Sequence, residues 1–441
     1  MPKLTNDLTQ AEPLSFTPEF LSAYNLMEHT ADHLFITGSA GTGKSTLLSY
    51  FRENTAKNVV VLAPTGIAAL NAGGQTIHSF FKFPLGVVTA KSITESPRKE
   101  FYQAIDTIVI DEVSMVRADI IDGIDSFMRI NGRNKKKPFG GVQMIFIGDL
   151  FQLPPVLSGD DEKSLFMSLY ETPYFFSASV FGKVQLRTLQ LRQIFRQSDA
   201  AFIELLQAIR TNCVEPSHLE RLNMRVKPEF LPSEEDFFIT LTTTNERASE
   251  MNIKCLSMLK AEPKQLMGTI EGIFDRKALP TEETLTLKKG AQVMFVRNDP
   301  YKRWVNGTIG KVREILPDAV KVEIERNGVR KVVTAERVEW QMLKYDFDAK
   351  TKEIFSEPIG AFTQFPLRLA WAVTIHKSQG KTFDKVVIDL GRGTFAHGQL
   401  YVALSRCRSL EGIVLRRPVR SDDVKVDLRI VDFMRQLSSS S

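Results

Sequence analysis

The sequence is poor in cysteine and has no long apolar run. Three cysteines are spread over 441 residues, too few and too far apart for a disulfide framework or a recognisable metal site, and this usage is typical of a reducing compartment. No run of about 18 apolar residues is present, so no membrane-spanning helix is predicted. The N-terminal stretch MPKLTNDLTQAEPL has acids and prolines where a signal peptide needs an apolar core. We therefore expect a cytoplasmic protein, or a nuclear or mitochondrial one if the source is eukaryotic, without a membrane partner.

A strong excess of either charge is also absent. Lysine and arginine number 57 against 52 aspartates and glutamates, which gives a net charge of +5. This balance permits a nucleic-acid partner but does not by itself indicate one. A hydrophobic content of 43% with 25% charged residues is typical of a globular protein, and the length predicts about two or three domains.

The stretch around which the chain is organised is GSAGTGKS at residues 38–45. It has the spacing G-x-x-x-x-G-K-[ST] and lies between an apolar run, 34–36, and a helix-like segment, 46–51, which is the context of a phosphate-binding loop. Glycines let backbone N–H groups point at phosphate oxygens. Lys44 would neutralise the β- and γ-phosphates, and the Ser45 hydroxyl would bind Mg²⁺. The residues predicted to contact ATP here are Gly38, Gly41, Thr42, Gly43, Lys44, Ser45 and Thr46.

Alternating strand-like and helix-like patterns indicate a parallel sheet around this loop. Residues 59–62, 107–110 and 143–147 are short apolar runs rich in β-branched side chains, typical of strands buried on both faces. Each is followed by polar or turn residues, as expected for ligand-binding loops at the carboxyl edge of such a sheet. A second region of this kind has strand-like runs at 237–242, 385–390 and 412–415. The sequence therefore predicts an α/β fold with two such regions.

Polar residues directly after two of the predicted strands suit ATP hydrolysis. Asp111 would hold Mg²⁺ beside the phosphate loop, and Glu112 would be the general base for the attacking water. Gln152, in GDLFQLPP after the next strand, has an amide able to sense the γ-phosphate and to report its loss. A motor that hydrolyses ATP needs the second acid, whereas a kinase or a simple nucleotide binder does not.

Two arginines, Arg196 and Arg406, lie in the second α/β region. Guanidinium groups supplied across a cleft stabilise a phosphoryl transition state. If both arginines reach the nucleotide, closure of the cleft is coupled to ATP. Considered alone, either arginine is more often an ordinary surface residue.

Three polar strings have no task in ATP hydrolysis, namely APTG at 63–66, TIHSF at 76–80 and TIHKSQG at 374–380. Hydroxyls, lysine and amides near helix starts are typical phosphodiester contacts, and histidine or phenylalanine can stack on bases. Helix caps and a core histidine explain the same residues equally well. The strings favour nucleic acid as the substrate without settling it.

Residues 297–365 have a different, antiparallel character. Alternation with period two at 320–324, followed by Asn327-Gly328 and the run 329–333, predicts a hairpin, and we expect a small β-barrel here. The polar stretch 84–98 is expected to form a small projection, or wedge, on the first region. The predicted domains are 1–184 with the wedge, 185–296 as the first part of the second domain, the inserted barrel 297–365, and 366–441 as the second part with the C-terminal tail.

The motifs GSAGTGKS, APTGIAA, TIHSF, IDEVSM, GDLFQLPP, FRQ, TIHKSQG and YVALSR, in this order, resemble those of superfamily-one helicases. Within that class they are similar to the PIF (petite integration frequency) family, relatives of RecD-type helicases. The resemblance implies two RecA-like P-loop NTPase domains, the wedge in the first and an SH3-like barrel in the second. It implies a monomer that uses ATP and Mg²⁺ to translocate 5′→3′ on single-stranded DNA and to unwind duplex or forked DNA. G-quadruplexes and RNA–DNA hybrids are further expected substrates.

The resemblance also implies roles for residues that the spacing leaves open. Arg196 and Arg406 would act as arginine fingers, and Gly380 would lie near the nucleotide. The expected setting is DNA replication, repair, recombination and telomere maintenance. The residues that would line the DNA path are Pro64, Thr65, Gly66, His78, Ser79, His376, Lys377 and Ser378.

The sequence departs from the family pattern in three respects. Relatives carry a glutamine upstream of the phosphate loop that reads adenine, but residues 16–20 contain none and Gln10 is too far upstream to assign, which leaves adenine selectivity open. The family signature between the third motif and the first arginine is recognisable only as residues 175–181. The long N-terminal extension of eukaryotic members is lacking, so we expect a compact, bacterial member.

Two other functions share part of this pattern. An ATP-gated nucleic-acid clamp that unwinds nothing would carry the same ATP motifs, and a translocation assay distinguishes it from a helicase. A P-loop enzyme with another substrate, such as a kinase, would need neither the second arginine-bearing region nor the acid pair at Asp111 and Glu112.

Overall fold

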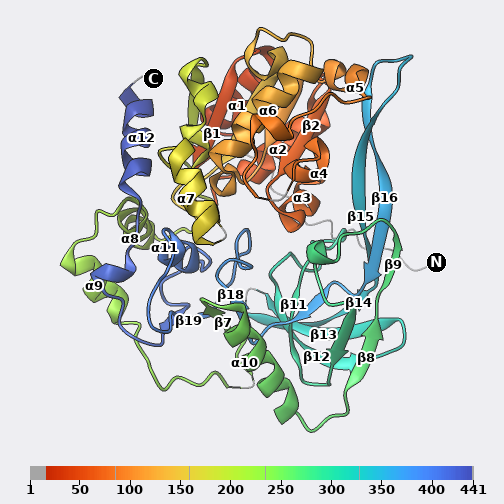
Figure 1. The fold of residues 1–441 in the computed structure, drawn as a ribbon. Coiled ribbons are helices and arrows are strands. Elements are labelled where there is room, and N and C mark those ends of the chain that lie inside the picture. Colours follow the sequence, from red (N-terminus) through yellow and green to blue (C-terminus); the bar gives the residue numbers. More distant parts are fainter. Residues whose placement is uncertain (1–15, 85, 158, 234, 327, 440–441) are drawn as a thin grey trace.

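The computed structural model describes residues 16–439 except 85, 158, 234 and 327. Gln10, considered above as a reader of adenine, lies outside the described residues. Two parallel sheets and an antiparallel region make up the described chain (Figure 1).

The first parallel sheet has six strands in the order β3-β2-β4-β5-β1-β6. Its strands are β1 (His33–Gly38), β2 (Val59–Ala63), β3 (Gln75–Thr76), β4 (Thr107–Ile110), β5 (Gln143–Gly148) and β6 (Leu186–Leu191). The strands predicted at 59–62, 107–110 and 143–147 are confirmed as β2, β4 and β5, and every residue of β4 and β5 is buried. The helices of this part are α1 (Pro18–His29), α2 (Lys44–Asn54), α3 (Gly66–Ala72), α4 (Ile77–Phe81), α5 (Lys99–Ala104), α6 (Ala118–Asn131) and α7 (Asp160–Leu169).

Helices cover both faces of this sheet. Alternate residues of a strand face opposite ways, so each buried strand presents apolar side chains to both layers of helices. Leu34 and Ile36 of β1 pack with α1 and α2 on one face, whereas Phe35 packs with α4, α5 and α6 on the other. The carboxyl ends of β1, β4 and β5 therefore meet at one edge, where the phosphate loop begins.

The second parallel sheet has four strands in the order β18-β7-β19-β20. They are β7 (Ile239–Thr242), β18 (Ala372–Thr374), β19 (Val386–Asp389) and β20 (Ile413–Leu415), with α8 (Ala200–Thr211), α9 (Pro216–Asn223), α10 (Asn245–Met258), α11 (Gln399–Leu404) and α12 (Leu428–Ser439). The strands predicted at 237–242, 385–390 and 412–415 are confirmed within about two residues of these bounds. The α/β prediction thus holds for both regions.

Antiparallel strands extend beyond the predicted insertion. They are β8 (Lys264–Met267), β9 (Thr269–Gly272), β10 (Thr284–Leu287), β11 (Gln292–Phe295), β12 (Ile309–Ile315), β13 (Ala319–Arg326), β14 (Val329–Glu336), β15 (Val338–Phe347), β16 (Ile354–Gln364) and β17 (Leu367–Leu369). The predicted hairpin is the β13–β14 pair. The bounds 297–365 were too narrow, because β11 and β17 pair with each other in the five-stranded sheet and so belong to the same unit.

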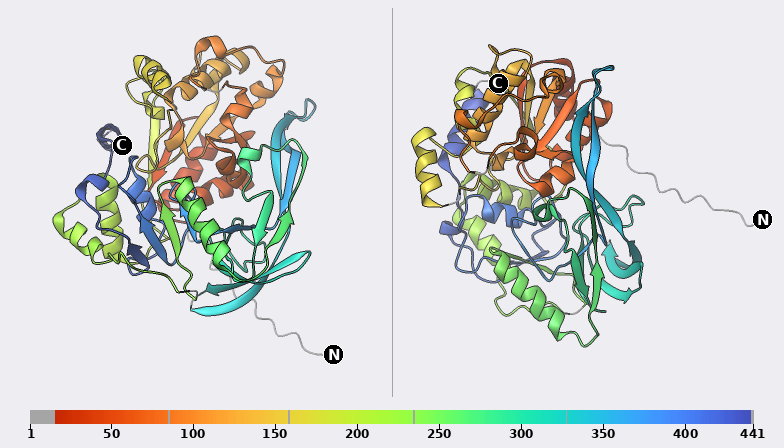
Figure 2. Two further views of the ribbon diagram at one scale, coloured as in Figure 1. Left: turned by 60° about the horizontal axis from the view of Figure 1, so that its bottom comes forward. Right: turned by 45° about the vertical axis from the view of Figure 1, so that its right-hand side comes forward.

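Two segments from the second half of the chain return to the first sheet (Figures 1 and 2). The β15–β16 hairpin, absent from the five-stranded sheet, reaches across so that Arg98 forms an ion pair with Asp346 at 2.7 Å. Helix α12 also packs on the first core, with the Phe433 ring stacked 4.1 Å from that of Phe176. The two halves are therefore joined at places that no motif marks.

The stretch predicted as a wedge, 84–98, is held along α6. The buried Val88 donates its N–H to Asp119 Oδ2 at 2.7 Å, and the N–H of Ser96 donates to Asn131 Oδ1 at 2.7 Å. Both acceptors lie on α6. The segment is thus anchored to the first region at two points.

Candidate nucleotide site and nucleic-acid surface

The phosphate loop joins β1 to α2 through two glycines in the left-handed region. Gly41 has φ +84° and Gly43 has φ +87°, conformations that favour glycine. A Cβ atom on Gly41 would lie 2.5 Å from Cβ of Arg196, and the N–H of Phe195 donates to Gly41 O at 2.9 Å. The segment that carries the first predicted arginine therefore lies directly against the loop.

Lys44 is held by the loop itself. Its ammonium donates to Gly38 O at 2.7 Å and to Ser39 O at 3.0 Å. Desolvation lowers the pKa of Lys44, although the charges of Asp149 and Glu112 oppose this shift. A cation surrounded by loop carbonyls in this way lies ready to neutralise a phosphate.

The two acids after β4 lie side by side and are only partly exposed. Burial, followed by the neighbouring Glu112 charge, raises the pKa of Asp111 to about 7. Burial also raises the pKa of Glu112, whose backbone has φ 53°. Because ionisation of these two adjacent carboxyl groups is unfavourable, a divalent cation bound beside them would stabilise their charged form. These carboxylates, together with the Ser45 hydroxyl at the start of α2, are oxygen donors of the kind that Mg²⁺ prefers.

A glutamine that sequence reasoning passed over joins the two regions at these acids. Gln379 Nε2 donates to Glu112 Oε2 at 3.3 Å and to Gln152 Oε1 at 3.1 Å. It lies in the string TIHKSQG, between the predicted Ser378 and Gly380. Its amide is polar and lies between two residues already predicted for the site. This position is the signal by which the sequence could have indicated Gln379. Gly380 itself has φ +77° and open space where a Cβ would lie.

Arg196 and Arg406 converge on Ser405. Arg196 Nη1 donates to Ser405 O at 3.2 Å, and Arg406 Nη2 donates to Ser405 Oγ at 3.0 Å. Burial and the Arg196 charge lower the pKa of Arg406 to about 9. In the part of the chain that the structure describes, neither guanidinium forms an ion pair, although Arg406 is 1% exposed. Two desolvated cations without an acid partner favour an anionic ligand.

The predicted DNA residues of the first region lie at helix starts. The Thr65 hydroxyl accepts from Ala68 N at 3.2 Å and so caps α3, as the simpler interpretation held. The half-buried His78, whose pKa is lowered by burial, precedes the exposed Ser79 on α4. Pro64 precedes this cap, and a Cβ on Gly66 would lie 2.4 Å from Cβ of Ala278 in the antiparallel region.

The predicted DNA residues of the second region differ in exposure. The His376 ring stacks on that of Phe395, with centroids 6.1 Å apart, and Phe395 is 61% exposed. Lys377 is exposed. The Ser378 side chain is fully buried and its hydroxyl donates to Ile375 O at 2.7 Å. It therefore faces the domain interior rather than the surface.

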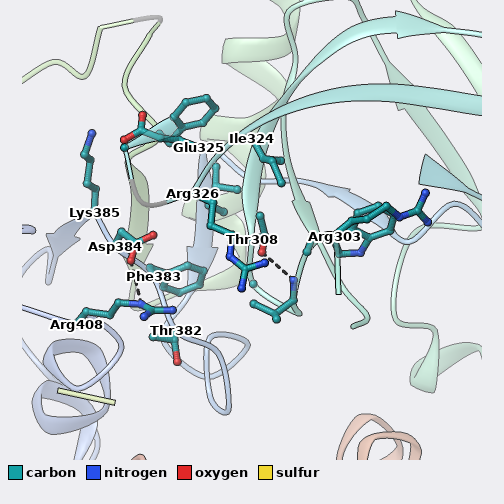
Figure 3. Close-up of a pocket in the computed structure, with 16 residues that line it drawn as sticks. Arg303, Thr308, Ile324, Glu325, Arg326, Thr382, Phe383, Asp384, Lys385 and Arg408 are labelled. Carbon is teal, nitrogen blue, oxygen red and sulfur yellow. Dashed lines mark hydrogen bonds and ion pairs between the residues drawn. The ribbon is translucent and has the colours of Figure 1, made fainter. Parts of the chain in front are cut away.

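A cavity of about 470 Å³ lies away from these residues, between the antiparallel region and the loop before β19 (Figure 3). Arg326 and Ile324 come from β13, and Phe383 and Asp384 from the loop. Arg408 pairs with Asp384 at 2.9 Å on its rim. None of the predicted ATP or DNA residues lines it, so this cavity is not the candidate site.

A phosphate loop and adjacent acids on one parallel sheet, contacted by Gln379 from the region of a second parallel sheet, define a P-loop NTPase of two RecA-like domains. A family model for PIF1-like helicases matches residues 21–217, and one for the UvrD-like helicase C-terminal domain matches 369–414. ATP-dependent DNA helicase Pif1 of Bdellovibrio bacteriovorus is 33% identical over 97% of this chain and 94% of its own length. The human ATP-dependent DNA helicase PIF1 is 35% identical over 92% of this chain, which spans 61% of that longer protein.

Solved structures of a bacterial relative agree with this assignment. Bacteroides Pif1 in complex with ADP-AlF4 matches with a TM-score of 0.90 at 38% identity, over 97% of this chain and 98% of that one. The same protein bound to single-stranded DNA matches with a TM-score of 0.68 at 38% identity, over 96% and 97% of the two chains. The chain belongs to the PIF1-like helicase family. The family resemblance and the two RecA-like domains are thereby confirmed, whereas the SH3-like character of the insertion stays a prediction.

Among the described residues, no helix is both long enough and apolar enough to cross a bilayer.

Proposed function

We propose that this chain is an ATP-dependent DNA helicase that translocates 5′→3′ on single-stranded DNA and unwinds duplex and forked DNA. The observation that carries the proposal is that Gln379 of the second RecA-like domain bonds both Glu112 and Gln152 of the first. Closure of two such domains on ATP, and their reopening, gives alternating grip on a strand. G-quadruplexes and RNA–DNA hybrids are further proposed substrates.

In this proposal Lys44 and the backbone N–H groups of the loop bind the phosphates, and Ser45 and Asp111 hold Mg²⁺. The metal, when bound, would neutralise phosphate charge. Glu112 takes the proton of the attacking water, a role that its raised pKa suits. Gln152, held by Gln379, senses the γ-phosphate.

The arginines complete the site, Arg196 from the segment after β6 of the first sheet and Arg406 from the second domain, just after α11. Arg196 and Arg406 supply positive charge to the transferring phosphoryl group, and their lack of an acid partner among the described residues supports this role. Gly380, beside Gln379, lies near the nucleotide. The other loop residues proposed to contact ATP are Gly38, Gly41, Thr42, Gly43 and Thr46.

The proposed DNA path crosses the helix starts of both domains. The exposed Ser79 and Lys377, with His376 beside Phe395, offer hydroxyl, ammonium and ring contacts to a strand. The remaining proposed contacts are Pro64, Thr65, Gly66, His78 and, through its backbone, Ser378. The segment 84–98 is proposed to split the duplex as the strand advances.

Three broader attributes are proposed with the same function. The protein acts as a monomer in a bacterial cytoplasm. The first domain is proposed to extend through β6, which pairs with β1, and the second domain to be interrupted by the antiparallel unit β8–β17. The insertion is proposed to be SH3-like.

The test is ATP hydrolysis with and without single-stranded DNA, followed by unwinding of duplexes with a 5′ or a 3′ tail. Stimulation by DNA and opening of the 5′-tailed duplex alone support the proposal, and Lys44→Ala should abolish both activities. Stimulation without opening would favour an ATP-gated clamp instead. Unwinding that persists in Lys44→Ala would overturn the assignment of the site.

A further inference from the structure

A fully buried carboxylate links the two RecA-like domains behind the phosphate loop. Asp149, directly after β5, is 0% exposed. Arg210 of α8 donates from Nη2 to its Oδ1 at 2.8 Å, and from Nε to Oδ1 at 3.2 Å and to Oδ2 at 3.4 Å. Because the two residues belong to different domains, this bidentate pair joins the domains where water is excluded.

The phosphate loop is tied to the same carboxylate through a tyrosine. The hydroxyl of Tyr401, on α11, donates to Asp149 Oδ2 at 3.3 Å and accepts from the N–H of Ala40 at 2.9 Å. Ala40 lies in the middle of the loop, so one of its backbone donors is engaged by the second domain. Gln207, one turn from Arg210 on α8, also donates to Ser39 Oγ at 2.7 Å.

The proposed γ-phosphate sensor belongs to this network as well. Gln152 Nε2 donates to Asp149 Oδ2 at 3.3 Å, while its Oε1 accepts from Gln379. The Arg210 guanidinium lies 4.3 Å from the ring centroid of Phe151. A Cβ on Gly398, the residue before α11, would lie 2.5 Å from Gln152 O. Gln152 therefore shares the Asp149 carboxylate with Arg210 of α8 and lies against the residue that precedes α11.

We infer that Arg210 and Tyr401 are positioning residues that couple the γ-phosphate sensor and the phosphate loop to domain closure through the carboxylate of Asp149. The inference rests on the proposed function and adds two residues to it. Neither side chain needs to touch ATP. Burial alone would raise the pKa of Asp149, but the Arg210 and Lys44 charges outweigh it and hold the pKa below its usual value, so the carboxylate stays charged.

The central test compares Tyr401→Phe with Tyr174→Phe. Tyr174 is a matched control, because its buried hydroxyl donates to Asp427 Oδ2 at 3.1 Å between distant segments far from the loop. In Tyr401→Phe, we expect kcat of DNA-stimulated ATP hydrolysis to fall about tenfold while KM for ATP changes less than about twofold. Base pairs opened per ATP should fall too, and Tyr174→Phe should stay within about twofold of the wild type in all three quantities.

A second pair of variants keeps the test open if Tyr401→Phe does not fold. Arg210→Lys keeps the charge but loses the bidentate geometry, and Arg303→Lys is its control, because Arg303 pairs bidentately with Asp299 within the antiparallel region. Lower kcat in Arg210→Lys alone supports the inference. Equal kcat and equal coupling for variants and controls overturns it. A wild-type protein without DNA-stimulated hydrolysis would instead overturn the proposed function, so the two failures are distinguishable.

Discussion

The hydroxyl of Tyr345, on the β15–β16 hairpin, accepts a hydrogen bond from the backbone N–H of Val61 at 2.9 Å. Val61 lies on β2, whose neighbour β3 pairs only with Leu62 and Ala63. The Tyr345 hydroxyl thus accepts from a backbone N–H of β2 that the short β3 does not reach. A side chain from the second half of the chain completes the sheet of the first.

Removal of this hydroxyl should destabilise the first domain. In Tyr345→Phe the Val61 N–H stays buried without a partner, which costs about 1–3 kcal/mol. The midpoint of urea unfolding, followed by circular dichroism, measures the loss. Tyr24→Phe is the control, because its hydroxyl bonds Asn54 O at an exposed position. An equal, small effect in both variants would contradict the structural role of the hairpin contact.

Gly41→Ala should block contact between the phosphate loop and the segment that carries Arg196. The new Cβ would meet the Arg196 side chain at 2.5 Å in addition to a strained φ of +84°. We expect kcat/KM for ATP to fall by roughly a hundredfold, since a misplaced site costs that much. Gly159→Ala carries similar strain at φ +83° but meets nothing within 4 Å. If both variants lose activity equally, backbone strain and not the Arg196 contact is responsible.

Glu112→Gln should separate ATP binding from hydrolysis. Loss of the general base is expected to lower kcat by about 10²–10⁴, while nucleotide binding, measured by fluorescence of a labelled analogue, persists. Because the Glu112 charge helps to raise the pKa of Asp111, the amide should also let Asp111 ionise at lower pH. Hydrolysis at the wild-type rate would exclude Glu112 as the base.

Phe395→Ala should weaken the grip on single-stranded DNA. An exposed ring stacked on His376 suits base stacking, which is worth about 1–3 kcal/mol per base. Affinity for a fluorescent oligonucleotide should therefore fall at every salt concentration, with its salt slope unchanged, since no phosphate contact is lost. Phe355→Ala, 46% exposed on the β15–β16 hairpin, is the matched control. Equal affinities of the two variants would place the strand elsewhere.

Much of the fold was predictable because the residue types of many segments match the buried positions that these segments take in the fold. The runs that became β2, β4 and β5 are apolar and rich in β-branched residues, which is typical of strands buried on both faces. The phosphate loop was equally readable, since its spacing reflects the backbone geometry required around phosphate. The insertion was bounded too narrowly because β11 and β17 are short apolar runs whose pairing spans more than 70 residues of chain, as in Val293 with Leu369.

The candidate site was only partly predictable, because several of its contacts also join residues that are far apart in the sequence. Lys44, Asp111 and Gln152 lie in the segments that follow β1, β4 and β5, so the sequence by itself determined their place in the fold, together with the two α/β regions and the family. Only the tertiary structure decided that Gln379 bridges the acid and the sensor, that Arg210 and Tyr401 share one carboxylate, and that a distant hairpin completes β2. These contacts join residues more than 60 positions apart, and such pairing depends on how packed domains face each other, which no local spacing encodes.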